Sequence, residues 1–156
     1  ALFVLPMPNS LAEIRHYSHQ LGTEVTLTAS LQQDIAFKPH SRRNKTMLLL
    51  GANGIATGID TLENDIIEKA GWTNYLPYPG FIALDLERIV ERKPDVLLWT
   101  SAHADKPSLA NLFVNHQALS SIEHIKQSIE NQSWRWQCPG PWSFNLVKEL
   151  AVWGAL

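Results

Sequence analysis

Hydrophobic and polar positions are most regular between residues 83 and 101. Leu86, Ile89 and Val90 recur with the spacing of one helical face, with acidic residues at the start of the segment and basic residues at its end. Pro94 ends this helix, and residues 96–99 form an unbroken apolar run, as in a strand buried on both faces. The pattern predicts a helix, a tight turn and a parallel strand, followed by a polar loop where open α/β sheets bind ligands.

A similar strand and helix are predicted near the start of the chain. Residues 2–5 are apolar, and Ser10 and Glu13 have the spacing of a capping box, which predicts a helix over residues 11–21. Gly22 is expected to end that helix in the left-handed conformation. This segment is therefore a strand followed by a helix.

The middle of the chain repeats the arrangement. Residues 47–50 are apolar, residues 51–58 contain three glycines, and residues 61–70 have a helical pattern. A weaker helical pattern over 24–37 predicts a helix that connects the two pairs. The glycine spacing fits neither the dinucleotide fingerprint nor the P-loop, which favours a loop that lets a ligand approach the backbone over a nucleotide site.

The last third of the chain has shorter patterns. We predict short helices over 109–115 and 118–125, a last strand over 134–136 and a closing helix over 143–152. Strands that alternate with helices indicate an α/β fold. The predicted architecture is a Rossmann-like three-layer lobe with a mainly parallel sheet.

Composition excludes several classes of function. The net charge is −2 and no basic run is longer than Arg42-Arg43, which argues against a nucleic-acid partner. No apolar stretch is long enough to span a membrane. The single cysteine excludes an intrachain disulfide and a multi-cysteine metal site.

A series of short motifs occurs in a fixed order along residues 42–156. The motifs are Thr57-Gly58, Ala70-Gly71-Trp72-Thr73-Asn74, Leu84-x-Leu86-Glu87-x-Ile89, Lys93-Pro94-Asp95-Val96, Asn115-His116-x-Ala118-Leu119, and Trp136-x-Cys138-Pro139-Gly140-Pro141-Trp142. This series resembles the carboxyl-terminal lobe of the periplasmic binding proteins that serve iron-siderophore, haem and cobalamin ABC importers. The resemblance implies a ligand held in the cleft between two such lobes.

The resemblance also implies a division of the chain. Residues 1–22 are similar to the last strand and helix of the amino-terminal lobe, residues 23–41 to the helix that joins the lobes, and residues 42–156 to the carboxyl-terminal ligand-binding lobe. About the first hundred residues of a whole binding protein have no counterpart here, and the joining helix is short. We therefore expect this chain alone to bind no chelate tightly.

Candidate ligand-binding residues come from the loops that follow the predicted strands. Tryptophan offers a wide contact area and an N–H donor, which suits a large, flat or hydrophobic chelate. A tryptophan at the end of an apolar strand is also a common core residue, so Trp99 has both interpretations. The candidate residues are Ile55, Thr57, Tyr78, Trp99, Ser101, His103, Trp136 and Trp142.

The sequence leaves two other classes of function open. An α/β nucleotide-using enzyme would need a nucleophilic or charged cluster, and Ser101, His103 and Asp105 on one loop do not suit a catalytic triad. A metal-ion binding protein of a related two-lobe type would need two or three His, Asp or Glu residues that converge from the cleft loops, and only His103 and Asp105 are available. His16 and His19 stand three apart on a helix without a third ligand, which argues against a zinc site there. We therefore predict no catalytic activity, no cofactor and no metal ligands.

The resemblance implies partners and a location. The ligand would be a ferric chelate or a corrinoid, the partner an ABC permease of the inner membrane, and the location the periplasm. Glu87 matches the family's permease-docking glutamate, and its place in the first turn of a helix would keep it exposed and ionised. The apolar faces within residues 2–21 lack the missing lobe, so they either fold back onto the carboxyl-terminal lobe or form a homodimer, which we favour.

Overall fold

The computed structural model describes residues 5–24, 40–100, 112–113, 116–122, 125–127 and 134–153. Most of the strand predicted over residues 2–5 and nearly all of the connecting helix lie outside these ranges, as do Ser101 and His103. Among the described residues, no helix has the length and hydrophobicity to cross a membrane.

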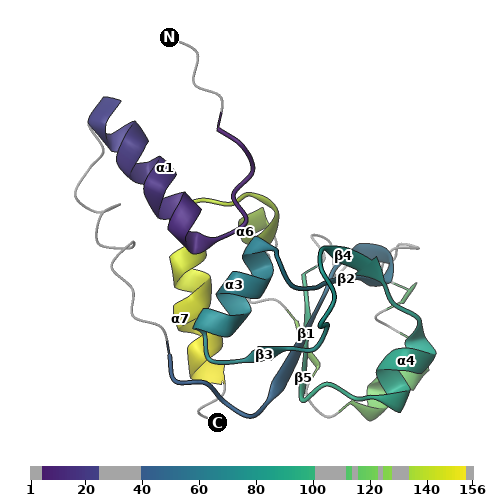
Figure 1. The fold of residues 1–156 in the computed structure, drawn as a ribbon. Coiled ribbons are helices and arrows are strands. Elements are labelled where there is room, and N and C mark those ends of the chain that lie inside the picture. The colour runs from purple at the N-terminus through teal and green to yellow at the C-terminus, as the bar shows by residue number, and fades with distance from the viewer. Residues whose placement is uncertain are drawn as a thin grey trace.

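The centre of the fold is a curled sheet of six strands (Figure 1). Along the sheet the order is β4-β2-β1-β5-β6, and β3 pairs with β1 beyond this path. Strands β1 and β5 were predicted, and their parallel pairing sets Leu50 opposite Trp99. The strand bounds are β1 Thr46–Leu50, β2 Ile55–Thr57, β3 Thr73–Asn74, β4 Phe81–Ala83, β5 Val96–Trp99 and β6 Ile125–Gln127.

The sheet is mixed, so the prediction of a mainly parallel sheet was wrong. β1 pairs in parallel with β3 and β5, and β5 with β6, but β2 is antiparallel to both β1 and β4. The cause lies in the glycine loop, where a 3-10 turn (η1, Ala52–Gly54) reverses the chain immediately after β1. Asn53 and Gly54 have φ of 58° and 73°, and the N–H of Gly51 donates to the carbonyl of Ile55 at 2.7 Å. Both residue types tolerate positive φ, which permits this tight hairpin.

Two helical layers cover the two faces of the sheet. One face packs against α3 (Leu62–Lys69) and α7 (Ser143–Trp153), with the start of α1 (Leu11–Glu24) against α3, and the other against α4 (Leu86–Glu91) and a 3-10 helix, η2 (Gln117–Ser121) (Figure 1). Along β1, Met47 and Leu49 belong to the first core, while Leu48 and Leu50 belong to the second. Burial on both faces explains the unbroken apolar runs and confirms the three-layer α/β prediction.

Several predicted boundaries need correction. Helix α1 continues through Gly22, which therefore does not end it. Residues 134–137 form a short helix, α6 (Trp134–Gln137), in place of the predicted strand. Tertiary contacts favour the helical conformation of this segment, because Arg135 pairs with Glu149 of α7 and Trp136 packs into the first core. The helix predicted over 118–125 is η2 followed by the start of β6.

Helix α1 packs back onto the rest of the chain. Leu11 and Ile14 are 1% and 3% exposed and join the core beside α3 and α7. The N–H of Leu11 donates to Oδ2 of Asp65 in α3 at 2.7 Å. Fold-back, the alternative that we disfavoured, is therefore the arrangement found for the first turns of α1, whereas Tyr17 and Leu21 stay half-buried.

Candidate ligand cavity

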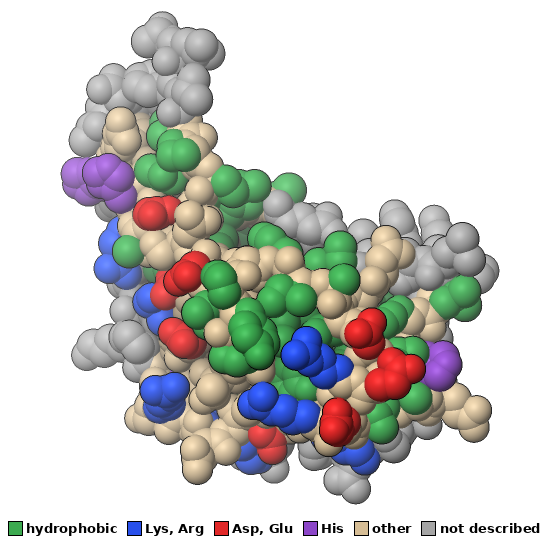
Figure 2. All heavy atoms as spheres, turned by 45° about the vertical axis from the view of Figure 1, so that its right-hand side comes forward, with side chains coloured by type: hydrophobic (Ala, Val, Ile, Leu, Met, Phe, Trp, Pro, Cys, Tyr) green, Lys and Arg blue, Asp and Glu red, His purple; other side chains and the backbone are tan. Residues whose placement is uncertain are grey.

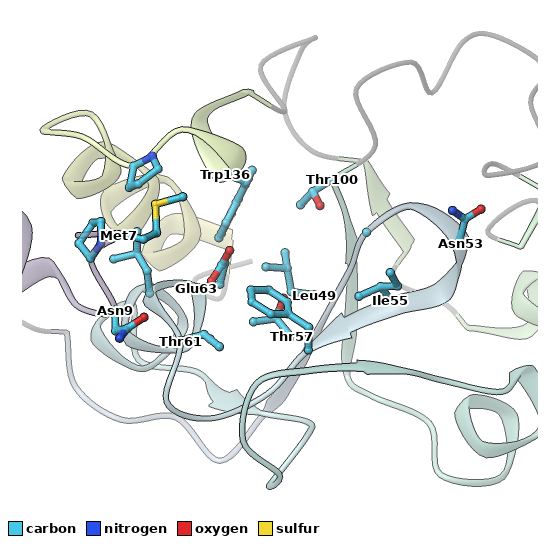
Figure 3. Close-up of a pocket in the computed structure, with 15 residues that line it drawn as sticks. Met7, Asn9, Leu49, Asn53, Ile55, Thr57, Thr61, Glu63, Thr100 and Trp136 are labelled. Carbon is cyan, nitrogen blue, oxygen red and sulfur yellow. The ribbon is translucent and has the colours of Figure 1, made fainter. Parts of the chain in front are cut away.

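A cavity of about 520 Å³ lies at the carboxyl edge of β1 and β5. Residues before α1, the β2 hairpin, the start of α3 and the α6 region surround it, and Figure 3 shows the lining side chains. Its place at this edge agrees with the site expected from the sequence. The lining residues are Met7, Pro8, Asn9, Leu49, Gly51, Asn53, Ile55, Thr57, Thr61, Leu62, Glu63, Phe81, Thr100, Trp136 and Pro139.

The parallel strands form the floor of the cavity. The N–H of Thr100 donates to the carbonyl of Leu50 at 3.0 Å, which continues the pairing of β1 and β5 to the last residue of the edge. Two residues of these strand ends line the cavity. Leu49 contributes an apolar side chain, and Thr100, which is buried, contributes a hydroxyl group. The antiparallel β2 extends this floor through Ile55 and Thr57.

The start of α3 brings polar groups to the cavity. The Thr61 hydroxyl accepts a hydrogen bond from the N–H of Asn64 at 3.2 Å, as an N-cap does, and donates to the carbonyl of Gly58 at 2.8 Å. The cap fixes the first turn of the helix, from which Glu63 reaches the cavity. In Figure 3 the Glu63 carboxyl points into the space between Trp136 and Leu49.

Glu63 is the ionisable residue among the described lining residues. Burial raises the pKa of its carboxyl above the ordinary value of 4.5, because a charged carboxylate loses hydration there. Hydrogen bonds to its own N–H and to Thr61 lower the pKa by a smaller amount. The cavity therefore holds an acid whose charge is only partly compensated by its surroundings.

An aromatic and aliphatic wall faces this acid. Trp136 is 7% exposed and lines the cavity together with Pro139, while Met7 and Pro8 come from the segment before α1. The proline-rich turn after α6 is held by Trp142, whose Nε1–H donates to the carbonyl of Cys138 at 2.7 Å. This wall suits the apolar surface of a bulky ligand.

The predicted site residues divide into three groups. Ile55, Thr57 and Trp136 line the cavity. Trp99 lies in the second core at 5% exposure, Tyr78 is exposed beneath the Arg88 guanidinium at 5.9 Å, and Trp142 packs within its turn. Ser101 and His103 lie outside the described residues.

Sequence reasoning missed several lining residues. Met7 and Pro8 belong to the segment that we placed outside the carboxyl-terminal lobe, and Phe81 belongs to an unpredicted strand. Glu63 has a sequence signal, since it stands in the first turn of a helix that follows a glycine loop, but its burial depends on distant segments. Across the described ranges, no three His, Cys, Asp or Glu residues gather closely enough to hold a metal ion.

Exposed hydrophobic side chains of β2 and β4 line the cavity. Ile55 is 44% exposed and Phe81 is 63% exposed, and both line the cavity. Nearby along the chain, Tyr78 is 49% exposed. Figure 2 shows hydrophobic side chains grouped in the middle of one face, with Lys and Arg and then Asp and Glu side chains beside them. Exposed apolar groups beside a cavity are typical of a surface that another body covers.

No protein-family model and no curated protein sequence matches this chain. Solved structures do resemble it. Helicobacter pylori CeuE, in a Ni-His complex, gives a TM-score of 0.63 at 17% identity and covers 94% of this chain and 51% of that chain. An ABC-type Fe3+-hydroxamate transport system protein from Saccharomonospora viridis gives a TM-score of 0.62 at 22% identity, with 90% and 55% covered. The periplasmic haem-binding protein HutB of Vibrio cholerae gives 0.51 at 18% identity, with 89% and 56% covered.

The fold is that of an α/β lobe of periplasmic solute-binding proteins. The resemblance found in the sequence motifs is thus confirmed for the fold. This chain spans 51% to 56% of the length of these three proteins. CeuE is described in a Ni-His complex, the Saccharomonospora viridis protein as part of an Fe3+-hydroxamate transport system, and HutB as a periplasmic haem-binding protein.

Proposed function

We propose that this chain is part of the solute-binding component of an ABC importer. The observation that carries the proposal is the cavity at the carboxyl edge of β1 and β5, on the fold of periplasmic solute-binding proteins. Apolar side chains dominate its wall, and hydroxyl groups and one acid are placed among them. This is the composition expected of a site for a bulky organic ligand.

The ligand class that we propose is a ferric siderophore, haem or a corrinoid. Each presents a large rigid surface that Trp136 and the aliphatic residues beside it would contact. A corrinoid has no counterpart among the ligands named for the three similar structures, so it rests on the sequence motifs alone. Delivery to a membrane permease from the periplasm, without catalysis, is part of the same proposal.

The division of the chain stays part of this proposal. Residues 42–156 would form the carboxyl-terminal lobe, residues 23–41 the interlobe connection, and residues 1–22 the end of the other lobe. One wall of a two-lobe cleft supplies about half of the contacts. Halving a nanomolar to micromolar binding free energy leaves affinity at about the millimolar level or weaker.

Ligand titrations test the proposal. The probes are a ferric trihydroxamate, haemin and cyanocobalamin, added both to this chain and to the whole binding protein that contains it, and followed by calorimetry and by absorbance. We expect tight binding of one probe to the whole protein and weak binding to this chain. Submicromolar binding by this chain would contradict the two-lobe site, and no binding of any probe to the whole protein would contradict the ligand class.

A matched pair of variants locates the binding site. Ile55 at the cavity mouth and Val152 on α7 are both exposed hydrophobic residues, at 44% and 63%. Ile55→Asp should weaken binding of the probe that binds, whereas Val152→Asp should leave it unchanged. Equal effects of the two variants would place the site elsewhere.

We also propose that Glu87 contacts the permease. It is exposed in the first turn of α4, near Arg88 and Leu86, and its surroundings leave the carboxylate accessible. A bidentate contact with a permease arginine would use both carboxylate oxygens.

A homodimer of this chain stays a prediction, but fewer apolar residues of α1 are available for the contact. The half-buried Tyr17 and Leu21 are the described residues of α1 that such a contact would use, because Leu11 and Ile14 are already covered. Sedimentation at several concentrations decides the matter, and a monomer throughout would contradict the dimer.

A further inference from the structure

We infer that the cavity selects ligands by charge, favouring a chelate that presents a cationic or hydrogen-bond-donating group to Glu63 over one that presents a carboxylate there. The inference rests on the proposed function, because it assigns a specificity to the same cavity. It concerns the chemistry of the ligand's periphery and not the metal at its centre.

The first step is the placement of Glu63. Its side chain is half-buried and points into the cavity, opposite Trp136 and beside Leu49 (Figure 3). The capped first turn of α3 fixes its backbone, since Thr61 bonds to both Asn64 and Gly58. A ligand that fills the cavity must therefore pass close to this carboxyl group.

The second step is the absence of a compensating charge in the described part of the cavity. None of the described lining residues is Lys, Arg or His. The ion pairs found among described residues are Lys69–Asp65 and Arg135–Glu149, and neither includes Glu63. The Thr61 hydroxyl also donates to the carbonyl of Gly58, so it compensates the Glu63 carboxyl only in part.

The third step is the effect on a ligand. In a partly dehydrated site, a carboxylate attracts a cation and repels an anion more strongly than it does in water. A charged hydrogen bond is worth roughly twice a neutral one. An ammonium or amide N–H on the ligand would bind Glu63, whereas a ligand carboxylate would have to protonate or move away from it.

Three chelates that differ only in one end group test the inference on this chain. The probes are gallium(III) complexes of a linear trihydroxamate that ends in an ammonium group, of its N-acetylated form and of its N-succinylated form. They share the same diamagnetic metal core and carry a cation, no charge and an anion. Binding is measured at millimolar concentration from NMR shifts of the Ile55 methyl and Trp136 indole signals.

We expect the ammonium form to bind about tenfold more tightly than the succinylated form, as loss of a charged contact would imply. Glu63→Gln should remove this order, and Glu63→Lys should reverse it. Asp60→Asn is the matched control, because Asp60 is an exposed acid near α3 that does not line the cavity. Its φ of 62° is one that asparagine also tolerates.

The outcomes separate this inference from the function beneath it. If the three chelates shift the two signals with equal affinity, or if Glu63→Gln keeps the order, the inference fails and the proposed cavity stands. If Asp60→Asn removes the order as well, the selection comes from the overall charge and the inference fails again. If no chelate shifts either signal in this chain or in the whole binding protein that contains it, the proposed function of the cavity fails.

Discussion

Asn74 of β3 donates its Nδ2 hydrogen to Oδ1 of Asn64 in α3 at 2.9 Å, and both side chains are buried. The Oδ1 atom of Asn74 in turn accepts from the N–H of Leu76 at 3.0 Å. The pair joins the helix that carries Glu63 to an edge of the sheet. The two asparagines are ten residues apart in the chain, and a hydrogen bond between their side chains connects the helix to the strand.

Loss of this buried pair should destabilise the fold. Asn74→Ala leaves Asn64 and the Leu76 N–H without these partners, which costs about 1–3 kcal/mol for each buried unsatisfied group. Urea unfolding measures the change, and a double-mutant cycle with Asn64→Ala isolates the coupling between the two side chains. The exposed Asn44→Ala is the control, and equal effects of Asn74→Ala and Asn44→Ala would contradict the prediction.

Two glycines near the cavity mouth should respond differently to alanine. A Cβ on Gly58 would lie 1.8 Å from the carbonyl oxygen of Tyr78, so Gly58→Ala must displace the 78–80 segment. A Cβ on Gly80 meets nothing within 4 Å, and its φ of 78° alone opposes the substitution. We expect Gly58→Ala to lower thermal stability well beyond Gly80→Ala, whose cost is about 1–2 kcal/mol. Similar melting temperatures for both variants would show that the close approach is relaxed in solution.

Asp95 should contribute to acid sensitivity. The N–H and hydroxyl of Thr46 both donate to Oδ2 of Asp95, at 2.6 and 2.8 Å. The N–H bond is the main cause that lowers the pKa of Asp95 below its ordinary 3.8. A lowered folded-state pKa stabilises the fold above the unfolded value, and this stability is lost as the pH falls through the folded-state pKa.

Asp95→Asn tests that contribution by urea unfolding at neutral pH and at about pH 3. Because Asp95 is exposed, we expect a small destabilisation at neutral pH that shrinks in acid. Asp60→Asn, which changes the charge at another exposed site, serves as the control. A difference between wild type and Asp95→Asn that grows in acid would refute the assignment.

Glu63 should have the opposite pH dependence. Its raised pKa means that the charged form is disfavoured in the folded state, so its contribution is most favourable below the ordinary value of 4.5 and is lost as the pH rises. Glu63→Gln should therefore be at least as stable as the wild type at neutral pH, with the gain closing below about pH 4.5. Chemical unfolding of both proteins across this range measures the difference, and a Glu63→Gln variant less stable than the wild type at neutral pH would contradict the burial argument.

Substitution of Glu87 should separate folding from transport. Glu87 is exposed, so Glu87→Ala should change the free energy of unfolding by less than about 0.5 kcal/mol. At a permease interface, loss of one partner of a charge pair costs about 2–5 kcal/mol. Uptake and ATPase coupling with the whole binding protein measure this loss, with Glu91→Ala on the same helix as control. Normal uptake by Glu87→Ala would leave Glu87 an ordinary surface acid.

The sequence predicted those helices and strands that are determined by their own residues. The runs over 47–50 and 96–99 are apolar because both faces of these strands are buried, and α3 has a cap and a helical stripe. The hairpin of β2 was missed because its strand has three residues and depends on positive φ at Asn53 and Gly54. Residues 134–136 were predicted as a strand but form a helix, in which Arg135 pairs with Glu149 of α7.

The cavity likewise combines residues that the local sequence predicts with residues that only tertiary contacts bring together. Ile55 and Thr57 follow β1 in the chain, so the rule that ligands lie at the carboxyl edge of parallel strands places them correctly. Trp136 also lines the cavity, but it does so from α6, where a strand was predicted. The role of Met7 and the burial of Glu63 arise from segments that the chain brings together only on folding. Burial of Trp99 in the second core likewise depends on η2 and its neighbours, which periodicity alone did not place.

The contact of α1 with α3 limits how far the amino-terminal end of this chain can be truncated. Met7, Pro8 and Asn9 form part of the cavity wall and are held there by Leu11, whose N–H bonds to Asp65. A protein engineer who trimmed the chain to start at residue 40 would keep every described strand and α3, but would open one side of the cavity to water. The same cut would remove Leu11 and Ile14 from the first core, so the residues before position 40 both shape the cavity and help to close the core.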